Sequence, residues 1–150
     1  MNLADYLAPT DIHLALRGGT KREVLAELAD GLGLEAEDRA AIRRILSHRE
    51  ESGSTGIGRG VAVPHCRTPL VKRLRVLYGR RPGGVDWGAS DGGPVEHVFL
   101  LVAPPVETSN DYLAMLGRIA RLAREPDAPT RLSAATSAAD VRGLLAEKGV

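Results

Sequence analysis

The chain has 150 residues, of which 43% are apolar and 26% charged, and its formal net charge is +1. This length suits one domain that buries roughly two thirds of the surface of its unfolded chain, and the composition is that of a folded protein rather than a disordered one. The near-neutral charge gives no overall field for recruiting nucleic acid or an anionic membrane, and a single cysteine, Cys66, excludes an intramolecular disulfide.

Two helices are expected in the first third of the chain, after a short strand. Alternating apolar residues predict the strand near residues 11–16. Thr20 and Glu23 then form a capping box, in which each side chain would accept a hydrogen bond from one backbone N–H at a helix start. A second amphipathic helix is predicted from about residue 36 to residue 50.

A glycine-rich turn at residues 53–60 leads into an apolar run at residues 61–63, which ends at Pro64. Glycine permits positive φ and close approach of the backbone to a ligand, and the valine-rich run favours a strand. Proline has no N–H and fixes its own φ. We therefore expect sheet pairing to stop at Pro64 and His65 to lie just past the strand end, where α/β proteins tend to place reactive side chains.

The next segments alternate between strand and loop. Residues 73–78 show the alternation of a strand, and residues 79–94, with six glycines and two prolines, are interpreted as a loop or loose hairpin. The continuous apolar run at residues 97–103 is typical of a central strand that is buried on both faces.

Helical patterns fill the remainder of the chain. Ser109 or Asn110 is expected to cap a third helix. Its apolar stripe is predicted to consist of Leu113, Leu116, Ile119 and Ala120. A short helical turn near residues 130–134 precedes a last helix, which a second capping-box pattern at residues 137–140 would start. The interleaved elements predict an α/β fold over residues 1–150, a single-domain sandwich with a mixed sheet flanked by helices.

Several familiar site chemistries do not fit the glycine-rich turn. Gly53 and Gly58 have the spacing of a phosphate-binding loop, but Arg59 and Gly60 replace its Lys-Ser/Thr pair. A strand rather than a helix follows, so the dinucleotide fingerprint fails as well. The histidines have no metal-ligand spacing, and no Gly-x-Ser-x-Gly elbow is present. We therefore expect neither a metal nor a cofactor.

What remains is a histidine nucleophile at His65. Neutral imidazole is a competent phosphoryl acceptor near neutral pH. Phosphoryl transfer then needs N–H donors and a cation around the phosphoryl oxygens. Glycine-rich backbone together with the hydroxyls of Ser54 and Thr55 could supply the donors, and Arg49 could supply the cation. The alternatives are that the two hydroxyls only form the turn and that Arg49 only offsets the helix dipole.

With these residues the chain resembles the fructose/mannitol-type (type 2) enzyme IIA domains of the bacterial phosphoenolpyruvate-dependent sugar phosphotransferase system. The matching positions are Arg49, Glu50, Ser54, Thr55, Gly56, Ile57, Gly58, Gly60 and the run from Val61 to Cys66. Residues 21–25 also look like that family, and the length is similar to that of its free-standing nitrogen-regulatory members.

The resemblance implies a phosphohistidine relay rather than a free-standing enzyme. His65 would accept phosphate from a phosphorylated HPr-like carrier and pass it to an enzyme IIB, or its phosphorylation state would act on a regulatory target. Arg49 and Tyr112 would complete the reacting site, with residues 54–58 as its binding turn. Family members usually carry a second histidine where this chain has Tyr112, so a non-catalytic regulatory module derived from enzyme IIA is the alternative.

The other candidates are given structural interpretations. Cys66 is expected to be a small packed residue and His97 a satisfied structural histidine, while His13 and His48 are assigned to the surface. Five basic residues are interpreted as a solvated face rather than a nucleic-acid site: Lys72, Arg73, Arg75, Arg80 and Arg81. With no apolar run approaching the roughly 18 residues of a membrane span and no signal peptide, we expect a cytoplasmic location without membrane insertion.

Overall fold

The computed structural model describes residues 2–105 and 111–150. The strands are β1 (Ile12–His13), β2 (Gly56–Gly58), β3 (Val61–Ala62), β4 (His65–Arg67), β5 (Arg75–Val85) and β6 (Val95–Ala103). The α-helices are α1 (Lys21–Asp30), α2 (Ala36–Glu51), α3 (Asp111–Arg124), α4 (Ala128–Ala134) and α5 (Ala138–Lys148), and two 3-10 turns, Leu3–Tyr6 and Pro9–Asp11, precede β1. The predicted α/β fold with a mixed sheet flanked by helices is confirmed.

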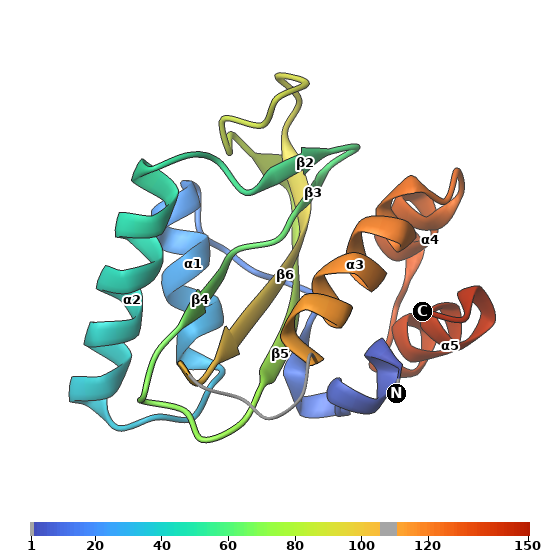
Figure 1. Ribbon diagram of the computed structural model, residues 1–150. Coiled ribbons are helices and arrows are strands. Elements are labelled where there is room, and N and C mark those ends of the chain that lie inside the picture. Colours follow the sequence, from blue (N-terminus) through green and yellow to red (C-terminus); the bar gives the residue numbers. More distant parts are fainter. Residues whose placement is uncertain (1, 106–110) are drawn as a thin grey trace.

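The sheet is built around β6. Its strand order is β1-β5-β6-β3-β2, and β4 also pairs with β6. β6 is antiparallel to β5 and parallel to β3 and β4. Helices α1 and α2 cover one face, and α3, α4 and α5 lie on the other (Figure 1). Alternate residues of β6 enter different cores, with Phe99 and Leu101 on the α3 side and Leu100 and Val102 on the α1–α2 side, so the predicted two-sided burial of this strand is confirmed.

The helix starts follow their capping residues. The Thr20 hydroxyl accepts from the Glu23 N–H at 3.2 Å and donates to the Glu23 carboxylate at 3.1 Å. At α5 the Ser137 hydroxyl accepts from the Asp140 N–H at 3.1 Å. A side-chain oxygen at the N-cap satisfies a backbone N–H that the first turn leaves unpaired, so both predicted starts are confirmed. The capping box at α1 is only half formed, because the Glu23 carboxylate accepts from the Thr20 hydroxyl in place of a backbone N–H. The predicted N-caps of α3, Ser109 and Asn110, lie outside the described residues.

Sheet pairing does not stop at Pro64, and that prediction is wrong. The Pro64 carbonyl accepts from the Leu101 N–H at 3.0 Å, and His65 then begins β4, parallel to β6. Proline removes only a donor from the ladder; its carbonyl still accepts, and the long strand β6 offers further partners beyond it. His65 is therefore the first residue of a strand.

Two further elements differ from their predictions. β5 continues through Val85, into the segment interpreted as a loop or loose hairpin, because β6 pairs with it on both sides of a register shift between Arg80 and Val85. The two strands are consecutive and antiparallel, so the hairpin alternative is confirmed, but its connection begins only after Val85. The buried face of α3 consists of Tyr112, Met115, Ile119, Leu122 and Ala123. Leu113, assigned to that face, is 62% exposed. The stripe is rotated because Tyr112 and Met115, two residues omitted from the prediction, fill the core.

The basic residues of β5 are not a purely solvated face. The Arg80 guanidinium donates to the carbonyls of Leu132 at 2.8 Å and Ala135 at 2.7 Å, near the end of α4. Arg81 donates to the Gly18 carbonyl at 2.8 Å. Cations beside unpaired carbonyls at a helix C-terminus are stabilising, so Arg80 joins the sheet to the helical layer.

Among the described residues, no helix has the length and apolar character needed to cross a membrane.

Candidate functional site

The ring of His65 is held by the backbone beside it. Its Nδ1 lies 2.7 Å from the Val63 carbonyl oxygen, and the side chain is half-buried. A carbonyl only accepts, so Nδ1 carries a proton, and in the neutral ring Nε2 is the nitrogen that keeps its lone pair. The hydrogen bond thus fixes the orientation of the ring and selects the neutral tautomer that has its lone pair on Nε2.

Tyr112 of α3 faces this ring from the helical layer. The His65 and Tyr112 ring centroids are 6.0 Å apart at an interplanar angle of 67°, an edge-on arrangement. The sequence prediction placed both residues at one site, and the structure brings them together. It also adds Arg67, whose Cζ lies 4.3 Å from the Tyr112 ring centroid and whose Nη1 donates to the Pro104 carbonyl at 3.1 Å.

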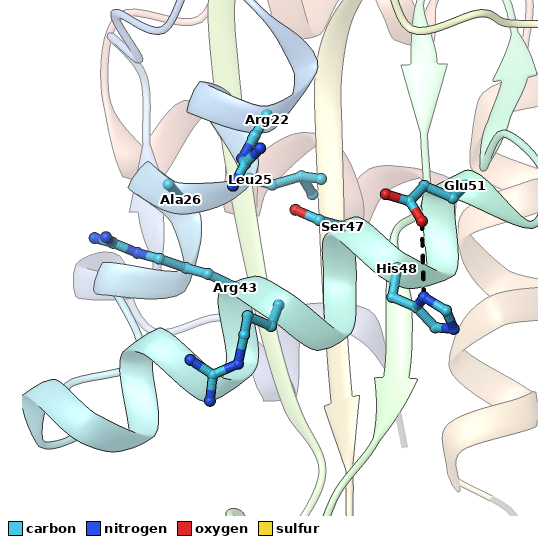
Figure 2. A pocket seen from close by; sticks show the side chains of 8 residues that line it. Arg22, Leu25, Ala26, Arg43, Ser47, His48 and Glu51 are labelled. Carbon is cyan, nitrogen blue, oxygen red and sulfur yellow. Dashed lines mark ion pairs between the residues drawn. The ribbon is translucent and has the colours of Figure 1, made fainter.

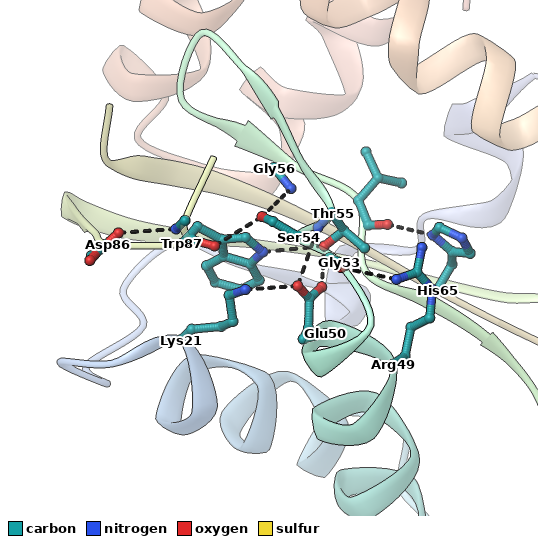
Figure 3. Close-up of polar contacts among 12 residues, drawn as sticks. Lys21, Arg49, Glu50, Gly53, Ser54, Thr55, Gly56, His65, Asp86 and Trp87 are labelled. Carbon is teal, nitrogen blue, oxygen red and sulfur yellow. Dashed lines mark hydrogen bonds and ion pairs between the residues drawn. The ribbon is translucent and has the colours of Figure 1, made fainter. Parts of the chain in front are cut away.

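Arg49 occupies the last turn of α2. Its Nη1 donates to the Gly53 carbonyl at 3.0 Å, and in Figure 3 its guanidinium points toward His65. The hydrogen bond closes the turn that joins the helix to the glycine-rich stretch. The predicted cation is therefore on the His65 side of this turn.

A buried polar network fixes the turn from beneath (Figure 3). The buried Glu50 carboxylate pairs with Lys21 Nζ at 2.8 Å and accepts from the Thr55 N–H at 3.2 Å and from the Thr55 hydroxyl. The Trp87 indole N–H donates to the same hydroxyl at 3.2 Å. A buried carboxylate is stable only when paired and hydrogen-bonded. Here the partners of Glu50 are Lys21 and Thr55, and Trp87 adds a third segment to the network through the Thr55 hydroxyl.

The hydroxyls of Ser54 and Thr55 therefore serve the turn itself in this structure. Ser54 donates to the Trp87 carbonyl at 2.9 Å and accepts from the Gly56 N–H at 3.1 Å. Thr55 is 5% exposed. As oriented, both hydroxyls donate to acceptors within the protein, and their role as donors to a bound anion stays a prediction.

The three residues of β2 differ in what they present to solvent. A Cβ at Gly56 would lie 2.7 Å from the Ala89 Cβ, so only glycine fits without a shift of the chain. Gly58 has φ +92°, a region that favours glycine. Ile57, between them, is 45% exposed. The two glycines are needed by the backbone, and Ile57 is the side chain that β2 offers at the surface.

The single cysteine and the other three histidines have surroundings that differ from those of His65. Cys66 packs with the α1–α2 core, and burial raises the pKa of its thiol to about 11, so it stays protonated. His97 is bonded to the Tyr78 hydroxyl at 2.8 Å and to Ser133 Oγ at 3.1 Å, as expected of a structural residue. His48 is exposed, but His13 is half-buried with its Nε2 enclosed, so its assignment to the surface is wrong.

A groove of about 370 Å³ lies between α1 and α2 (Figure 2). It is lined by Arg22, Leu25, Ala26, Arg43, Arg44, Ser47, His48 and Glu51. Two of its lining residues, His48 and Glu51, pair with each other at 3.7 Å, and a third, Arg43, pairs with Asp30 outside the lining. The groove lies on the face of the sheet opposite α3, so it takes no part in the arrangement around His65 and Tyr112.

Comparison with known proteins gives one consistent result. The model of the family described as phosphoenolpyruvate-dependent sugar phosphotransferase system, EIIA 2, matches residues 5–148. A nitrogen regulatory protein of Bradyrhizobium diazoefficiens is 37% identical over 147 residues, which cover 97% of this chain and 95% of that protein.

Two solved structures show the same fold. The crystal structure of nitrogen regulatory protein IIA-Ntr from Neisseria meningitidis aligns with a TM-score of 0.86 at 31% identity, over 95% of this chain and 98% of that one. The crystal structure of IIA mannitol from Escherichia coli aligns with a TM-score of 0.75 at 23% identity, over 93% and 98% of the two chains.

Proposed function

The chain belongs to the type 2 EIIA family of the phosphoenolpyruvate-dependent sugar phosphotransferase system, and from this membership we propose that His65 is its phosphoryl acceptor. The observation that carries the proposal is the 2.7 Å contact between His65 Nδ1 and the Val63 carbonyl. In the neutral imidazole it selects the tautomer with the lone pair on Nε2, on a half-buried ring beside a glycine-rich turn, and that lone pair is what a nucleophile requires.

In the proposed step the Nε2 lone pair forms a new N–P bond. The N–P bond of a phosphohistidine donor breaks at the same time, and its electron pair returns to the donor ring nitrogen. The proton on Nδ1 stays where it is, and its hydrogen bond to Val63 strengthens because the ring gains positive character as the bond forms. No separate base is needed, since the tautomer is already set.

Charge and geometry around the acceptor come from the neighbouring elements. We assign Arg49 to the phosphoryl oxygens, since its guanidinium is permanently charged and points toward His65. The Tyr112 ring lies 6.0 Å from the His65 ring, centroid to centroid, and we assign its hydroxyl as a donor to one phosphoryl oxygen. For Ser54 and Thr55 we propose a positioning role, because their hydroxyls bond to Trp87 and Glu50. These bonds fix the turn that leads into residues 56–58.

The donor we propose is a phosphorylated HPr-like carrier, and the recipient an enzyme IIB or a regulatory target. Similarity to nitrogen regulatory proteins along nearly the whole chain favours the regulatory output. A second candidate, a non-catalytic protein-binding module, is favoured by Tyr112, which is neutral where the family usually has a second imidazole.

Incubation with phosphoenolpyruvate, enzyme I and HPr tests the proposal. The protein should gain one phosphoryl group that is labile in acid and stable in base. His65→Ala should abolish the gain, and His48→Ala, at an exposed histidine of α2, should leave it intact. A wild-type protein that stays unlabelled, or a His65→Ala variant that labels equally, contradicts the proposal.

The second candidate makes the opposite prediction about partners. A non-catalytic module should capture the same target protein whether or not His65 is present. Pulldown with wild type and His65→Ala, each with and without prior phosphorylation, separates the two. Binding that depends on the phosphorylation state of His65 supports the relay, and binding that is identical in all four samples supports the module.

A further inference from the structure

His65 and Arg67 leave β4 on the same side of the sheet. Side chains alternate between the two faces of a strand, so residues two apart share a face. β4 pairs in regular parallel register with β6, from His65 opposite Leu101 to Arg67 opposite Ala103. Cys66, between them, packs into the α1–α2 core. His65 and Arg67 therefore both face the layer that contains α3.

The ring of Tyr112 contacts both residues. Its centroid is 6.0 Å from the His65 ring centroid and 4.3 Å from Arg67 Cζ. A guanidinium at that distance over an aromatic face is held by the ring quadrupole. The bond from Arg67 Nη1 to the Pro104 carbonyl, at 3.1 Å, attaches the same side chain to the end of β6. Two independent contacts thus fix an exposed arginine beside the acceptor.

We propose that Arg67 is a catalytic residue that supplies positive charge to the phosphoryl group on His65, with the Tyr112 ring as its support. The inference rests on the proposed acceptor role of His65. Tyr112 itself is neutral and can only donate a hydrogen bond, whereas a guanidinium stays charged at every physiological pH. A phosphoryl group carries nearly two negative charges, so a fixed cation favours it over the unmodified ring.

Arg67 and Arg49 reach the site from different elements. Arg49 comes from the last turn of α2 and is tied to the Gly53 carbonyl, while Arg67 comes from β4. Two cations on separate supports can contact different phosphoryl oxygens, and phosphoryl transfer is stabilised by positive charge placed around those oxygens. Tyr112 is neutral, but its ring holds the charged Arg67 guanidinium at the site.

The kinetic test replaces the charge and keeps the polar shape. Arg67→Gln should accept phosphate from phosphorylated HPr roughly 10- to 100-fold more slowly than wild type. Arg67→Lys should recover part of the rate, because it restores the charge without the planar stacking group. Arg73→Gln is the matched control, since it removes the same charge from an exposed position outside the strands and should leave the rate unchanged.

Two further measurements separate a catalytic from a structural role. The second ionisation of the phosphoryl group, followed by ³¹P NMR, should move to higher pH in phosphorylated Arg67→Gln and stay in place in Arg73→Gln, because a lost cation disfavours the dianion. Rate losses for Arg67→Gln and Tyr112→Leu should also be less than additive in the double variant, since both remove the same supported charge.

The outcomes distinguish the two proposals. If the wild type is never phosphorylated, the acceptor role of His65 fails. If the wild type is phosphorylated but Arg67→Gln matches it in rate and in phosphoryl ionisation, the role of Arg67 alone is overturned. The same conclusion follows if Arg73→Gln slows the reaction as much as Arg67→Gln, because the effect then reflects overall charge.

Discussion

Replacing Thr55 with valine tests whether the buried network beneath the glycine-rich turn stabilises the protein. Thr55→Val keeps the side-chain shape but removes the hydroxyl that donates to Glu50 and accepts from the Trp87 indole at 3.2 Å. A hydrogen bond to a charged group contributes about 1.5–3 kcal/mol and one between neutral groups about 0.5–1.5 kcal/mol. The loss also leaves the indole N–H unpaired in a residue that is 1% exposed. We expect the free energy of unfolding to fall by about 2–4 kcal/mol.

Urea unfolding measures this loss, with an unchanged denaturant slope as the sign that both variants unfold to the same extent. Thr55→Ser is the matched control: it retains the hydroxyl and should lose only the contribution of one methyl group, about 1 kcal/mol. The reasoning is refuted if Thr55→Val lies within about 0.5 kcal/mol of wild type. It is equally refuted if Thr55→Ser is destabilised as much as Thr55→Val.

Three further predictions concern pH, thiol reactivity and glycine. Burial lowers the pKa of His97 below its usual 6.5. Its neutral form therefore contributes stability that is fully present above about pH 6.5 and is lost as the pH falls toward the folded-state pKa. In urea unfolding at a series of pH values, the free energy of unfolding of His97→Gln should fall less steeply with acid than that of wild type, and equal slopes would contradict this. The Cys66 thiol, with a pKa raised to about 11, should react with a thiol reagent at pH 8 far more slowly in the folded protein than in denaturant, and equal rates would refute its burial. Gly56→Ala should destabilise the protein by about 1–3 kcal/mol because its Cβ would meet Ala89. Gly117→Ala, at a helical position with open space around it, should stabilise it by up to about 1 kcal/mol. A higher melting temperature for Gly56→Ala than for Gly117→Ala would contradict the close packing of Gly56 against Ala89.

Elements whose signals are local could be predicted from the sequence. The caps at Thr20 and Ser137 act on a backbone N–H three residues away, so the helix starts follow from neighbours in the chain. The nine-residue strand β6 is a continuous apolar run and needs no knowledge of its partners. The grouping of His65 with Tyr112 came from the family resemblance, and the structure brings the two rings together.

Features that depend on distant partners could not be predicted in this way. β5 continues across Gly79 because β6 pairs with it there. The glycine at this position is needed for packing, since a Cβ would lie within 2.7 Å of the Leu16 and Leu28 side chains. β4 forms after Pro64 for the same reason, since β6 supplies its partners. Arg67 was missed because its relation to His65 depends on that strand, whose alternation places the two side chains on one face.

The position of the phosphate on the His65 ring tests the central claim most directly. In this structure Nδ1 donates to the Val63 carbonyl at 2.7 Å, so in the neutral ring only Nε2 has a lone pair for the incoming group. NMR of the phosphorylated, ¹⁵N-labelled protein distinguishes the two ring nitrogens by their coupling to phosphorus. We expect coupling to Nε2 of His65; coupling to Nδ1, or a phosphoryl group on any other residue, would contradict the account.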